Sequence, residues 1–506
     1  MVKKLVSYIL LLTLLSGNTV YAQKGKFEYP FKFSSKQFKT MANAVNLLAD
    51  KGVDHLSLII HDKKKADYIE LDKNLKIVSS FSLPAKNVSF SKYDIIGGEY
   101  DMQHVGNFAS PASGRFNFVY SLQLHGNPAK ESFIATAVDF NKKTATDKEI
   151  IERNGQEITL QSFSMEGHFY CVRANNKEEE LVFYLFDREG KLKKKSIPFK
   201  VPVGKKKDRN SITEYLGKAA LIKENEEPDI EEGTATAKVY FNSDEIVFVI
   251  NEGASPTHLI NFDKNTLALK ETFIDHSSLF SNADKDKSTV NSYLSEEKLF
   301  TVIVNKNDLV VAEYGLDGVL VNKQAINEES MHTVLSSPIK YEEKKKGKVK
   351  EEEIENFSTL LKILHSQSTG ITAGITQDKN YVITIGTYEP IMVSSTGSGR
   401  ITFDNYSKGG GYVGNNTYAN YTPGISTYSK SSNFFKKTTF RIMMEGNSFT
   451  NRKSKHSSTL RDQIQDFMED KSKIMRKQFA IGEKQYLGYY DFDTNAFFIE
   501  NIPIKK

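Results

Sequence analysis

Residues 298–326, KLFTVIVNKNDLVVAEYGLDGVLVNKQAI, show most clearly the local pattern from which the fold is predicted. Short apolar runs rich in Val, Leu, Ile and Phe alternate with turns that contain Asn, Asp and Gly. These turn residues tolerate the positive φ of a tight hairpin, and apolar runs this short favour β-strands over helices. The stretch therefore predicts three antiparallel strands, Lys298–Asn305, Asp308–Gly315 and Val319–Ile326, with a turn at Leu316-Asp317-Gly318.

The same pattern recurs along the chain. Four further meanders are predicted at Leu56–His61, Ala66–Asp72 and Lys76–Leu83; at Phe116–Gln123, Glu131–Phe140 and a strand to Ile151; at His168–Ala174, Glu180–Asp187 and Lys191–Phe199; and at Glu245–Glu252, Thr257–Asp263 and Leu267–Ile274. A sixth unit is expected to begin at Asn380–Tyr388 and to resume at Thr438–Met444 after an insertion. A last hairpin, Gln485–Asp491 and Ala496–Ile502, is expected to close with the N-terminal strand Phe27–Phe33.

This repeated meander resembles the blades of β-propeller proteins across most of residues 50–506. Radial stacking of such sheets buries both faces and leaves only short edges. The Asp-type turns begin at 72, 139, 187, 263 and 315, so their spacings are 67, 48, 76 and 52 residues. A blade takes about 40–50 residues, so the longer spacings imply insertions. The predicted fold is an all-β propeller of six or seven irregular blades with short helical insertions, one at Asn356–His365; serial β-sandwiches or a β-solenoid are the alternative.

The chain contains no tryptophan. It therefore lacks the Trp-Asp dipeptide of WD repeats and the tryptophans of sialidase Asp-boxes and of quinoprotein dehydrogenase motifs. Because a fold does not carry a function by itself, the resemblance implies an architecture and no activity.

The N-terminus has the three parts of a secretory signal over residues 1–22. Lys3 and Lys4 precede the apolar run Leu5–Leu15, and Val20-Tyr21-Ala22 supplies small residues at a cleavage site. An uncleaved anchor is the alternative, but a spanning helix needs about 20 apolar residues. We expect a mature chain of residues 23–506 that forms one propeller-like domain without a transmembrane span. The signal resembles those of Gram-negative bacteria, which implies export to the periplasm or to the outer membrane.

The small net charge argues against a nucleic-acid-binding protein, and the single cysteine argues against a disulfide-stabilised fold. The formal charge of +5 falls to +3 when Lys3 and Lys4 are removed, and this small excess does not indicate a nucleic-acid partner. Cys171 is the only cysteine, so no internal disulfide forms. It lies in the strand-like run His168–Arg173 and is expected to be a buried structural residue.

Motifs for catalysis or for a metal are missing. There is no His-Glu-x-x-His, no Gly-x-Ser-x-Gly and no P-loop, and the Ser-x-x-Lys matches at Ser89 and Ser337 lack partner motifs. The run Asp284–Ser288 has the alternating ligands of a calcium loop, but Thr289 stands where that loop needs glycine and Ser295 where it needs glutamate. No cofactor and no metal site are therefore predicted, and the catalytic residues of any enzyme remain unassigned.

Two segments depart from the strand pattern. Residues 394–433 are rich in Gly and Tyr, which predicts either a disordered excursion or a recognition loop whose ligand-binding residues are Tyr412, Tyr418 and Tyr421. Residues 457–479 carry apolar side chains at helical spacing. They predict an amphipathic helix that packs on the sheets; the alternative is a groove-binding or membrane-surface helix.

These observations predict a non-enzymatic binding or scaffolding protein of the bacterial cell envelope, with a protein or glycan partner. The alternative is a hydrolase that acts on an envelope or extracellular polymer through carboxylates at the mouth of a propeller. Such carboxylates lie far apart in sequence and are recognised only by their geometry.

Overall fold

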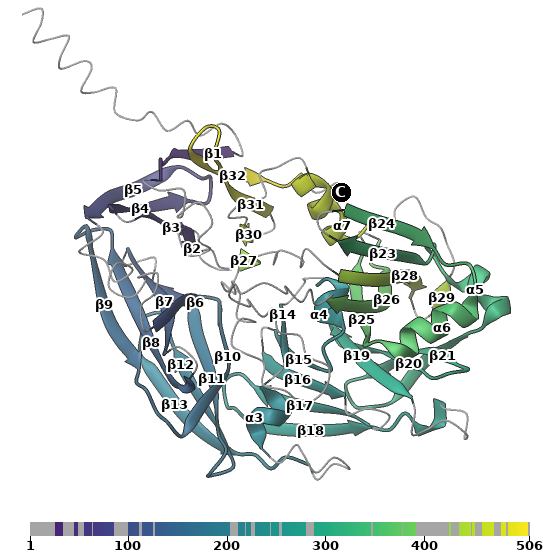
Figure 1. The fold of residues 1–506 in the computed structure, drawn as a ribbon. Coiled ribbons are helices and arrows are strands. Elements are labelled where there is room, and N and C mark those ends of the chain that lie inside the picture. The colour runs from purple at the N-terminus through teal and green to yellow at the C-terminus, as the bar shows by residue number, and fades with distance from the viewer. Residues whose placement is uncertain are drawn as a thin grey trace, which may run out of the picture. The chain divides into compact units, whose positions relative to one another are not determined.

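The computed structural model consists of β-sheets, with short helices in some of the connections (Figure 1). The described strand pairs are antiparallel except for β14 (Ala220–Lys223) and β15 (Ala237–Phe241), which pair in parallel. It describes residues 26–33, 45–48, 55–62, 64–84, 100–110, 114–124, 127–202, 211–217, 219–223, 228–242, 244–251, 256–279, 288–345, 348–376, 378–390, 425–426, 435–446, 448–450, 458–469, 477–481 and 484–503. The strands of this part form seven sheets, which confirms the predicted all-β propeller. The chain divides into two compact units: unit 1 is Met1–Pro198, Thr417–Ser429 and Phe467–Pro503, and unit 2 is Phe199–Asn416, Lys430–Asp466 and Ile504–Lys506.

Unit 1 contains four of the sheets, which we call blades 1, 2, 3 and 7. Blade 1 is β2 (Val45–Leu48), β3 (His55–His61), β4 (Lys65–Asp72) and β5 (Ile77–Pro84). Blade 2 is β6 (Tyr100–Ser110), β7 (Arg115–Leu124), β8 (Asn127–Asp139) and β9 (Thr144–Ile151). Blade 3 is β10 (Glu157–Met165), β11 (His168–Asn175), β12 (Glu180–Phe186) and β13 (Leu192–Pro198).

Blade 7 combines strands from both ends of the chain. It is β1 (Lys26–Pro30), β32 (Ala496–Asn501), β31 (Lys484–Asp491), β30 (Lys477–Ile481) and β27 (Ile425–Ser426), in that order. β1 pairs antiparallel with β32, and Phe27 stands opposite Ile499. The prediction that the N-terminal strand closes the last hairpin is therefore confirmed.

Unit 2 contains blades 4, 5 and 6. Blade 4 is β14 (Ala220–Lys223), β15 (Ala237–Phe241), β16 (Glu245–Asn251), β17 (Thr257–Asp263) and β18 (Leu269–Ile274). Blade 5 is β19 (Thr289–Ser295), β20 (Lys298–Val304), β21 (Leu309–Gly315) and β22 (Leu320–Ile326). Blade 6 is β24 (Lys348–Glu353), β23 (Lys340–Lys345), β28 (Phe435–Glu445), β26 (Tyr381–Pro390) and β25 (Thr369–Ile375), and β29 (Ser448–Thr450) pairs with β28.

The predicted hairpin turns at 73–74, 188–190, 264–265 and 316–318 are all present. In the first of them Asp72 Oδ1 accepts the backbone N–H groups of Asn74 and Lys76, and Leu75 has a φ of 62°. Asp187 and Asp263 accept two backbone N–H groups each in the same way. A carboxylate that binds the turn backbone is the physical reason why Asp ends the strand before the turn in blades 1, 3 and 4.

The meanders predicted for blades 1, 2, 3 and 5 each lacked the first strand of the sheet, and the meander predicted for blade 4 lacked the first two, β14 and β15. The strand β10 shows why. In β10 the polar residues Gln161, Ser162 and Ser164 are all buried. Ser164 Oγ accepts the backbone N–H of Asn107 in β6 at 2.6 Å, so a polar group of blade 3 bonds to the backbone of blade 2. Such a strand is buried on both faces and alternates only weakly between apolar and polar residues. A search for alternation with a period of two therefore does not detect it.

Apolar side chains fill the space between successive blades within each unit. Separate clusters lie between blades 7 and 1, between blades 1 and 2, and between blades 2 and 3, and one large cluster joins blades 4, 5 and 6. Cys171 belongs to the cluster of blades 2 and 3, is 0% exposed, and has a pKa raised to about 12 by burial. A thiol with this pKa stays protonated at neutral pH, which agrees with a structural role.

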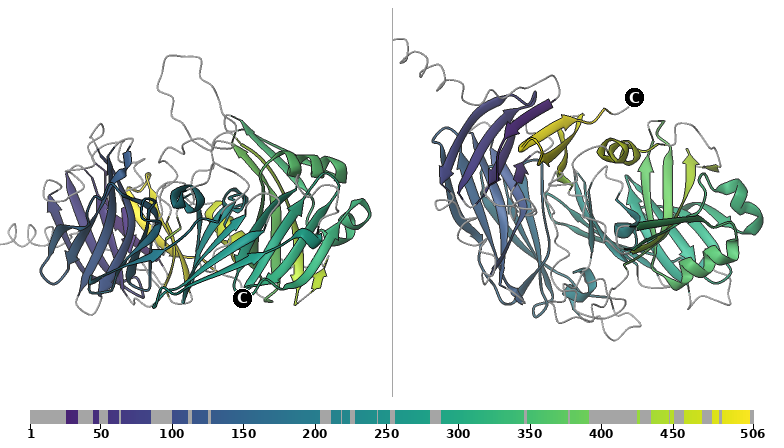
Figure 2. Two further views of the ribbon diagram at one scale, coloured as in Figure 1. Left: turned by 90° about the horizontal axis from the view of Figure 1, so that it is seen from below. Right: turned by 45° about the horizontal axis from the view of Figure 1, so that its top comes forward.

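Helices are short and occur in the connections. They are α3 (Ile212–Leu216), α4 (Ile230–Gly233), η5 (Ser277–Leu279), α5 (Glu328–Val334), α6 (Phe357–Ser366) and α7 (Leu460–Glu469). The predicted helix at Asn356–His365 is confirmed by α6, and Figure 2 shows α5 and α6 in green beside the sheets of unit 2. None of the described helices is long and apolar enough to span a membrane.

The predicted amphipathic helix at 457–479 is shorter than expected. Helix is assigned to Leu460–Glu469, whereas Lys477–Ile481 forms β30 and pairs with β31. The apolar spacing continues through Phe479, but Phe479 stacks on Tyr486 of β31 at a ring distance of 5.6 Å. Tertiary pairing with β31 therefore overrides the helical periodicity at this end.

Candidate functional site

A partly buried cluster of charged residues lies around α4 in unit 2. Asp229 caps the helix N-terminus, and its side chain accepts the backbone N–H of Ile230 at 2.6 Å. Glu231 and Glu232 follow in the first turn. The helix packs closely on β25, since a Cβ on Gly233 would lie 2.7 Å from Thr372 Cγ2 and one on Gly370 would lie 2.6 Å from the Thr234 nitrogen. The local order Asp-Ile-Glu-Glu suits a helix start.

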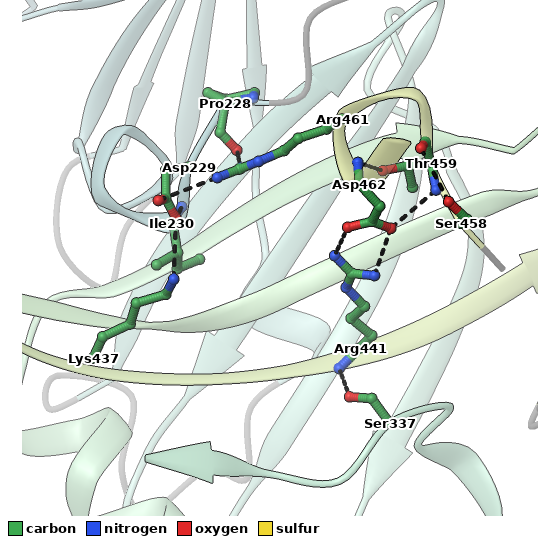
Figure 3. Close-up of polar contacts among 10 residues, drawn as sticks. All are labelled: Pro228, Asp229, Ile230, Ser337, Lys437, Arg441, Ser458, Thr459, Arg461 and Asp462. Atoms are coloured by element: carbon green, nitrogen blue, oxygen red, sulfur yellow. Dashed lines mark hydrogen bonds and ion pairs between the residues drawn. The ribbon is translucent and has the colours of Figure 1, made fainter. Parts of the chain in front are cut away.

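Two cations from distant parts of the chain meet Asp229 (Figure 3). Arg461 of α7 places Nη2 3.1 Å from Oδ2 of Asp229, and its Nη1 donates to the carbonyl of Pro228. Lys437 of β28 places Nζ 3.5 Å from Oδ1. Burial alone would raise the pKa of Asp229, but the two cations and the Ile230 N–H lower it overall. Asp229 therefore stays ionised, although 42% of its side chain is exposed and the ion pairs are partly screened.

A second ion pair anchors the start of α7 to the same face of β28. Lys437 and Arg441 are four residues apart in a strand, so they point to one side of the sheet. Arg441 donates to both carboxylate oxygens of Asp462, at 2.8 and 2.6 Å (Figure 3). Asp462 also accepts the backbone N–H of Thr459, whose hydroxyl accepts the Asp462 N–H. This two-point contact and the reciprocal cap fix the first turn of α7 on blade 6.

Glu231 and Glu232 titrate near neutral pH. Burial, followed by the charges of Glu232 and Asp229, raises the pKa of Glu231 to about 8. Burial and the charge of Asp229 raise the pKa of Glu232 to about 7, and its Oε2 is buried without a hydrogen-bond partner among the described residues. Carboxyl groups with raised pKa values can donate a proton at neutral pH, which is the property of a general acid.

This cluster lies at the root of the Gly/Tyr-rich segment. β26 ends and β28 begins at the antiparallel pair Pro390–Phe435, so residues 391–434 connect two neighbouring strands of blade 6. The connection also contains β27 (Ile425–Ser426), which pairs with β30 of blade 7. Tyr388 stacks on Phe435 at a ring distance of 5.5 Å, and Ile230 of α4 packs against both rings. The two ends of the segment are thus held beside α4 by strand pairing and by an aromatic pair.

The ligand-binding residues predicted from the sequence are not tested by the described part of the structure. Tyr412, Tyr418 and Tyr421 lie outside the described residues, as do Asp284 and Asp286 of the calcium-like run. The described part of the chain contains no group of three or more His, Cys, Asp or Glu residues that could hold a metal ion. Ser337 of the Ser-x-x-Lys match accepts the backbone N–H of Arg441, so its hydroxyl has a structural partner.

Two histidines form polar networks inside blades 4 and 5. His276 Nε2 lies 2.8 Å from Thr257 Oγ1, which lies 3.1 Å from Ser292 Oγ, and all three residues are at most 1% exposed. Burial lowers the pKa of His276 to about 4 and that of His258 to about 4. The Thr257–His276 pair is too deeply buried to contact a substrate from solvent. It connects the sheets of blades 4 and 5.

The α4 cluster was not predicted from the sequence. The helix start at Asp229 is a local signal that could have been used. The partners Lys437 and Arg461 lie more than 200 residues further along the chain, and their approach has no local signal.

No family model matches this chain, and no curated protein does so either. Among solved structures, it is similar to the β-propeller domain of the Trilobed protease from Pyrococcus furiosus, with 9% identity, 78% of this chain and 80% of that chain covered, and a TM-score of 0.26. It is also similar to the WD40 domain of SCAP from fission yeast, with 9% identity, 96% and 93% covered, and a TM-score of 0.28. A prolyl endopeptidase shares 10% identity over 70% of this chain at a TM-score of 0.25, and the chain spans only 57% of that protein. The fold assignment rests on the strand pairing described above, and no function is carried over from these proteins.

Proposed function

We propose that this protein is a non-enzymatic binding or scaffolding protein of the bacterial cell envelope that captures a protein or glycan with its Gly/Tyr-rich segment. The observation that carries this proposal is the root of that segment. Residues 391–434 leave and re-enter blade 6 at the paired residues Pro390 and Phe435, beside α4 and α7, which ion pairs attach to β28. Recognition loops on a rigid sheet are a common arrangement for binding, and tyrosine supplies a large contact surface.

The envelope location is part of the same proposal and is supported by the sequence of residues 1–22, which lie outside the described residues. Removal of this signal after Ala22 would release the propeller into the periplasm, where it would remain in solution or associate with the outer membrane.

Replacing Tyr412, Tyr418 and Tyr421 with serine is expected to abolish partner capture without changing the melting temperature. Aromatic anchors carry a large share of the energy of an interface, and three losses of about 2 kcal/mol each reduce affinity by several orders of magnitude. Capture is measured by affinity purification of the full-length protein after cross-linking in intact cells. A short Gly/Ser linker in place of residues 394–421, which leaves β27 (Ile425–Ser426) paired with β30 in blade 7, is expected to have the same effect. Loop closure changes stability by only about 0.6 kcal/mol per doubling of length.

The matched control replaces two exposed apolar residues away from this segment, Val319 and Val321, with serine; they are 59% and 51% exposed. This control is expected to retain every partner. A linker variant that is stable and still captures all partners would contradict the proposal, and so would a serine variant that loses partners only because it unfolds.

A second candidate function follows from the raised pKa values of Glu231 and Glu232. As a hydrolase of an envelope or extracellular polymer, the protein would use Glu231 as the general acid, which is protonated below about pH 8. Glu232, with a pKa of about 7, would be the base that is ionised above that pH. Activity would then peak between about pH 7 and about pH 8 and fall on both sides.

If this second function is present, E231Q and E232Q are each expected to lower turnover by a factor of about 100 or more. Release of soluble fragments from isolated peptidoglycan and from envelope polysaccharide measures the activity across the pH range. D466N, which changes an exposed acid on α7, is the control and should keep full activity. A wild-type protein that releases no fragments removes this candidate and leaves the binding proposal in place.

A further inference from the structure

Lys238 is a fully buried lysine in β15 of unit 2, with 0% of its surface exposed. Its Nζ donates to the carbonyl oxygen of Ala235 at 2.7 Å and to Oδ1 of Asn291 at 2.5 Å. Among the described residues these two oxygens are its only polar partners, and no carboxylate lies within ion-pair distance. A lysine buried without a counter-ion is rare, because an isolated charge in a protein interior is costly.

Asn291 extends this contact to the neighbouring blade and to α4. From β19 of blade 5, its Nδ2 donates to the carbonyl of Gly233 at 3.2 Å and to the carbonyl of Thr369 at 2.9 Å. Gly233 is the last residue of α4, and Thr369 is the first residue of β25 in blade 6. The Lys238–Asn291 pair therefore connects blades 4, 5 and 6 with the C-terminal end of α4.

The number of donors and acceptors at this pair fits a neutral amine. A neutral amine has two N–H groups, and the site offers two oxygens that accept from Nζ. An ammonium has three N–H donors, so one of them would have no acceptor among the described residues, and its charge would be fully buried. The amide of Asn291 is already satisfied, since its oxygen accepts once and its nitrogen donates twice.

We propose that the Lys238–Asn291 pair is a proton-sensitive clamp that holds α4 between blades 4, 5 and 6, tight when the amine is neutral and loosened when it is protonated. α4 carries Asp229, Glu231 and Glu232, so the clamp sets the position of that cluster. A buried polar network whose members are all satisfied stabilises one arrangement, and one that gains an unpaired charge loses that advantage.

The pKa of Lys238 agrees with this proposal, since burial lowers it to about 7. A lysine in the unfolded chain has a pKa of about 10.4. Between about pH 7 and about pH 10 the unfolded chain therefore binds one more proton than the folded chain. The penalty for burying this lysine is therefore complete below about pH 7 and shrinks as the pH rises above it.

Other titratable groups lie on the elements that pack around Lys238. They are Asp229, Glu231 and Glu232 of α4, Lys223 of β14, Tyr240 of β15, Glu245 of β16 and Tyr293 of β19. β25 carries none. Glu231 and Glu232 act in the opposite sense, because their raised folded pKa values make stability fall as the pH rises from about 4.5 to about 8. Comparing a lysine variant with the wild type at each pH removes these contributions.

The test is thermal unfolding of the full-length protein and of K238M at several pH values. K238M is expected to melt at a higher temperature than the wild type near pH 7, and this advantage should shrink by about 4 °C or more between about pH 7.5 and about pH 9. Hydrogen exchange is compared between the two proteins at each pH, as protection relative to the intrinsic exchange rate at that pH. In α4, β19 and β25 the wild type should be less protected than K238M at the lower pH, and this difference should shrink at the higher pH.

Three further variants make the result specific. K238Q is neutral and keeps two N–H donors, so it provides the comparison if K238M does not fold. K270M removes an exposed lysine of β18 in the same blade and should leave the pH dependence unchanged. The pH-dependent difference between the wild type and K238M should persist when both proteins also carry E231Q. A melting difference that stays constant across this pH range, or no change of exchange in α4, would overturn the proposal.

Discussion

Replacing Gly386 with alanine is expected to destabilise unit 2 by about 3 kcal/mol or more, because the new methyl group has no space. Gly386 lies in β26, opposite Gly370 of β25 and opposite Thr439 of β28. A Cβ at this position would overlap the carbonyl oxygen of Thr438 and would lie 3.1 Å from the Cα of Thr439. These are backbone atoms of the paired strand, so no side-chain rotation relieves the clash.

The measurement is urea unfolding of G386A beside the wild type, with hydrogen exchange to locate the loss of protection in β26 and β28. Since residues 391–434 are attached to these two strands, capture of a partner should also fall. G155A is the control, because nothing lies within 4 Å of a Cβ at Gly155, and it should leave stability within about 0.5 kcal/mol. A G386A protein as stable as the wild type would show that β26 and β28 can separate without cost.

Replacing Arg173 with methionine is expected to destabilise unit 1 by about 3–5 kcal/mol, the usual range when one partner of a buried charged network is removed. Arg173 is 1% exposed and lies in β11. Its guanidinium donates to the carbonyls of Glu131 and Glu152, at 3.2 and 3.3 Å, and Nη1 lies 3.8 Å from Glu157 Oε2. Methionine fills a similar volume, but it cannot donate a hydrogen bond. The carbonyl of Glu131 in blade 2 and that of Glu152 in the connection to blade 3 would both lose this donor.

Chemical unfolding of R173M measures this effect, and R173K separates charge from geometry. Lysine keeps the charge, but a single ammonium cannot reproduce the planar fork that reaches both carbonyls, so R173K should lose most of the same free energy. R115M is the control: Arg115 pairs with Asp139 at 3.5 Å with 59% of its side chain exposed, and its loss should cost less than about 1 kcal/mol. Equal effects of R173M and R115M would contradict the interpretation of Arg173 as a buried connector between blades 2 and 3.

The sequence alone predicted most of the strands, because turns and alternation are local. Asp72 accepts backbone N–H groups two and four residues ahead, and the hairpin that it forms was correctly predicted. The strands that were missed, such as β10, carry polar residues that are satisfied by another blade. The helix predicted at 457–479 extends too far towards the C-terminus. Phe479 belongs to β30, and its partner Tyr486 lies in β31, later in the chain.

The candidate site could not be predicted in the same way. Asp229, Lys437 and Arg461 come from α4, β28 and α7, and each looks like an ordinary surface charge in its own stretch of sequence. Lys238 lies in β15, a strand that was not predicted from the sequence and whose five residues are all buried. Its burial follows from the close approach of β19, β25 and α4, which brings the amide of Asn291 to its amine.

Local sequence patterns were enough to predict the all-β propeller class, the positions of the hairpins and the N-terminal strand that closes blade 7, because backbone turns and a period of two along a strand are encoded within a few residues. Which charged groups are buried and paired could be read only from the three-dimensional contacts. Burial and pairing depend on residues from separate blades and helices, and it is this environment that moves the pKa values of Glu231, Glu232 and Lys238 toward neutral pH.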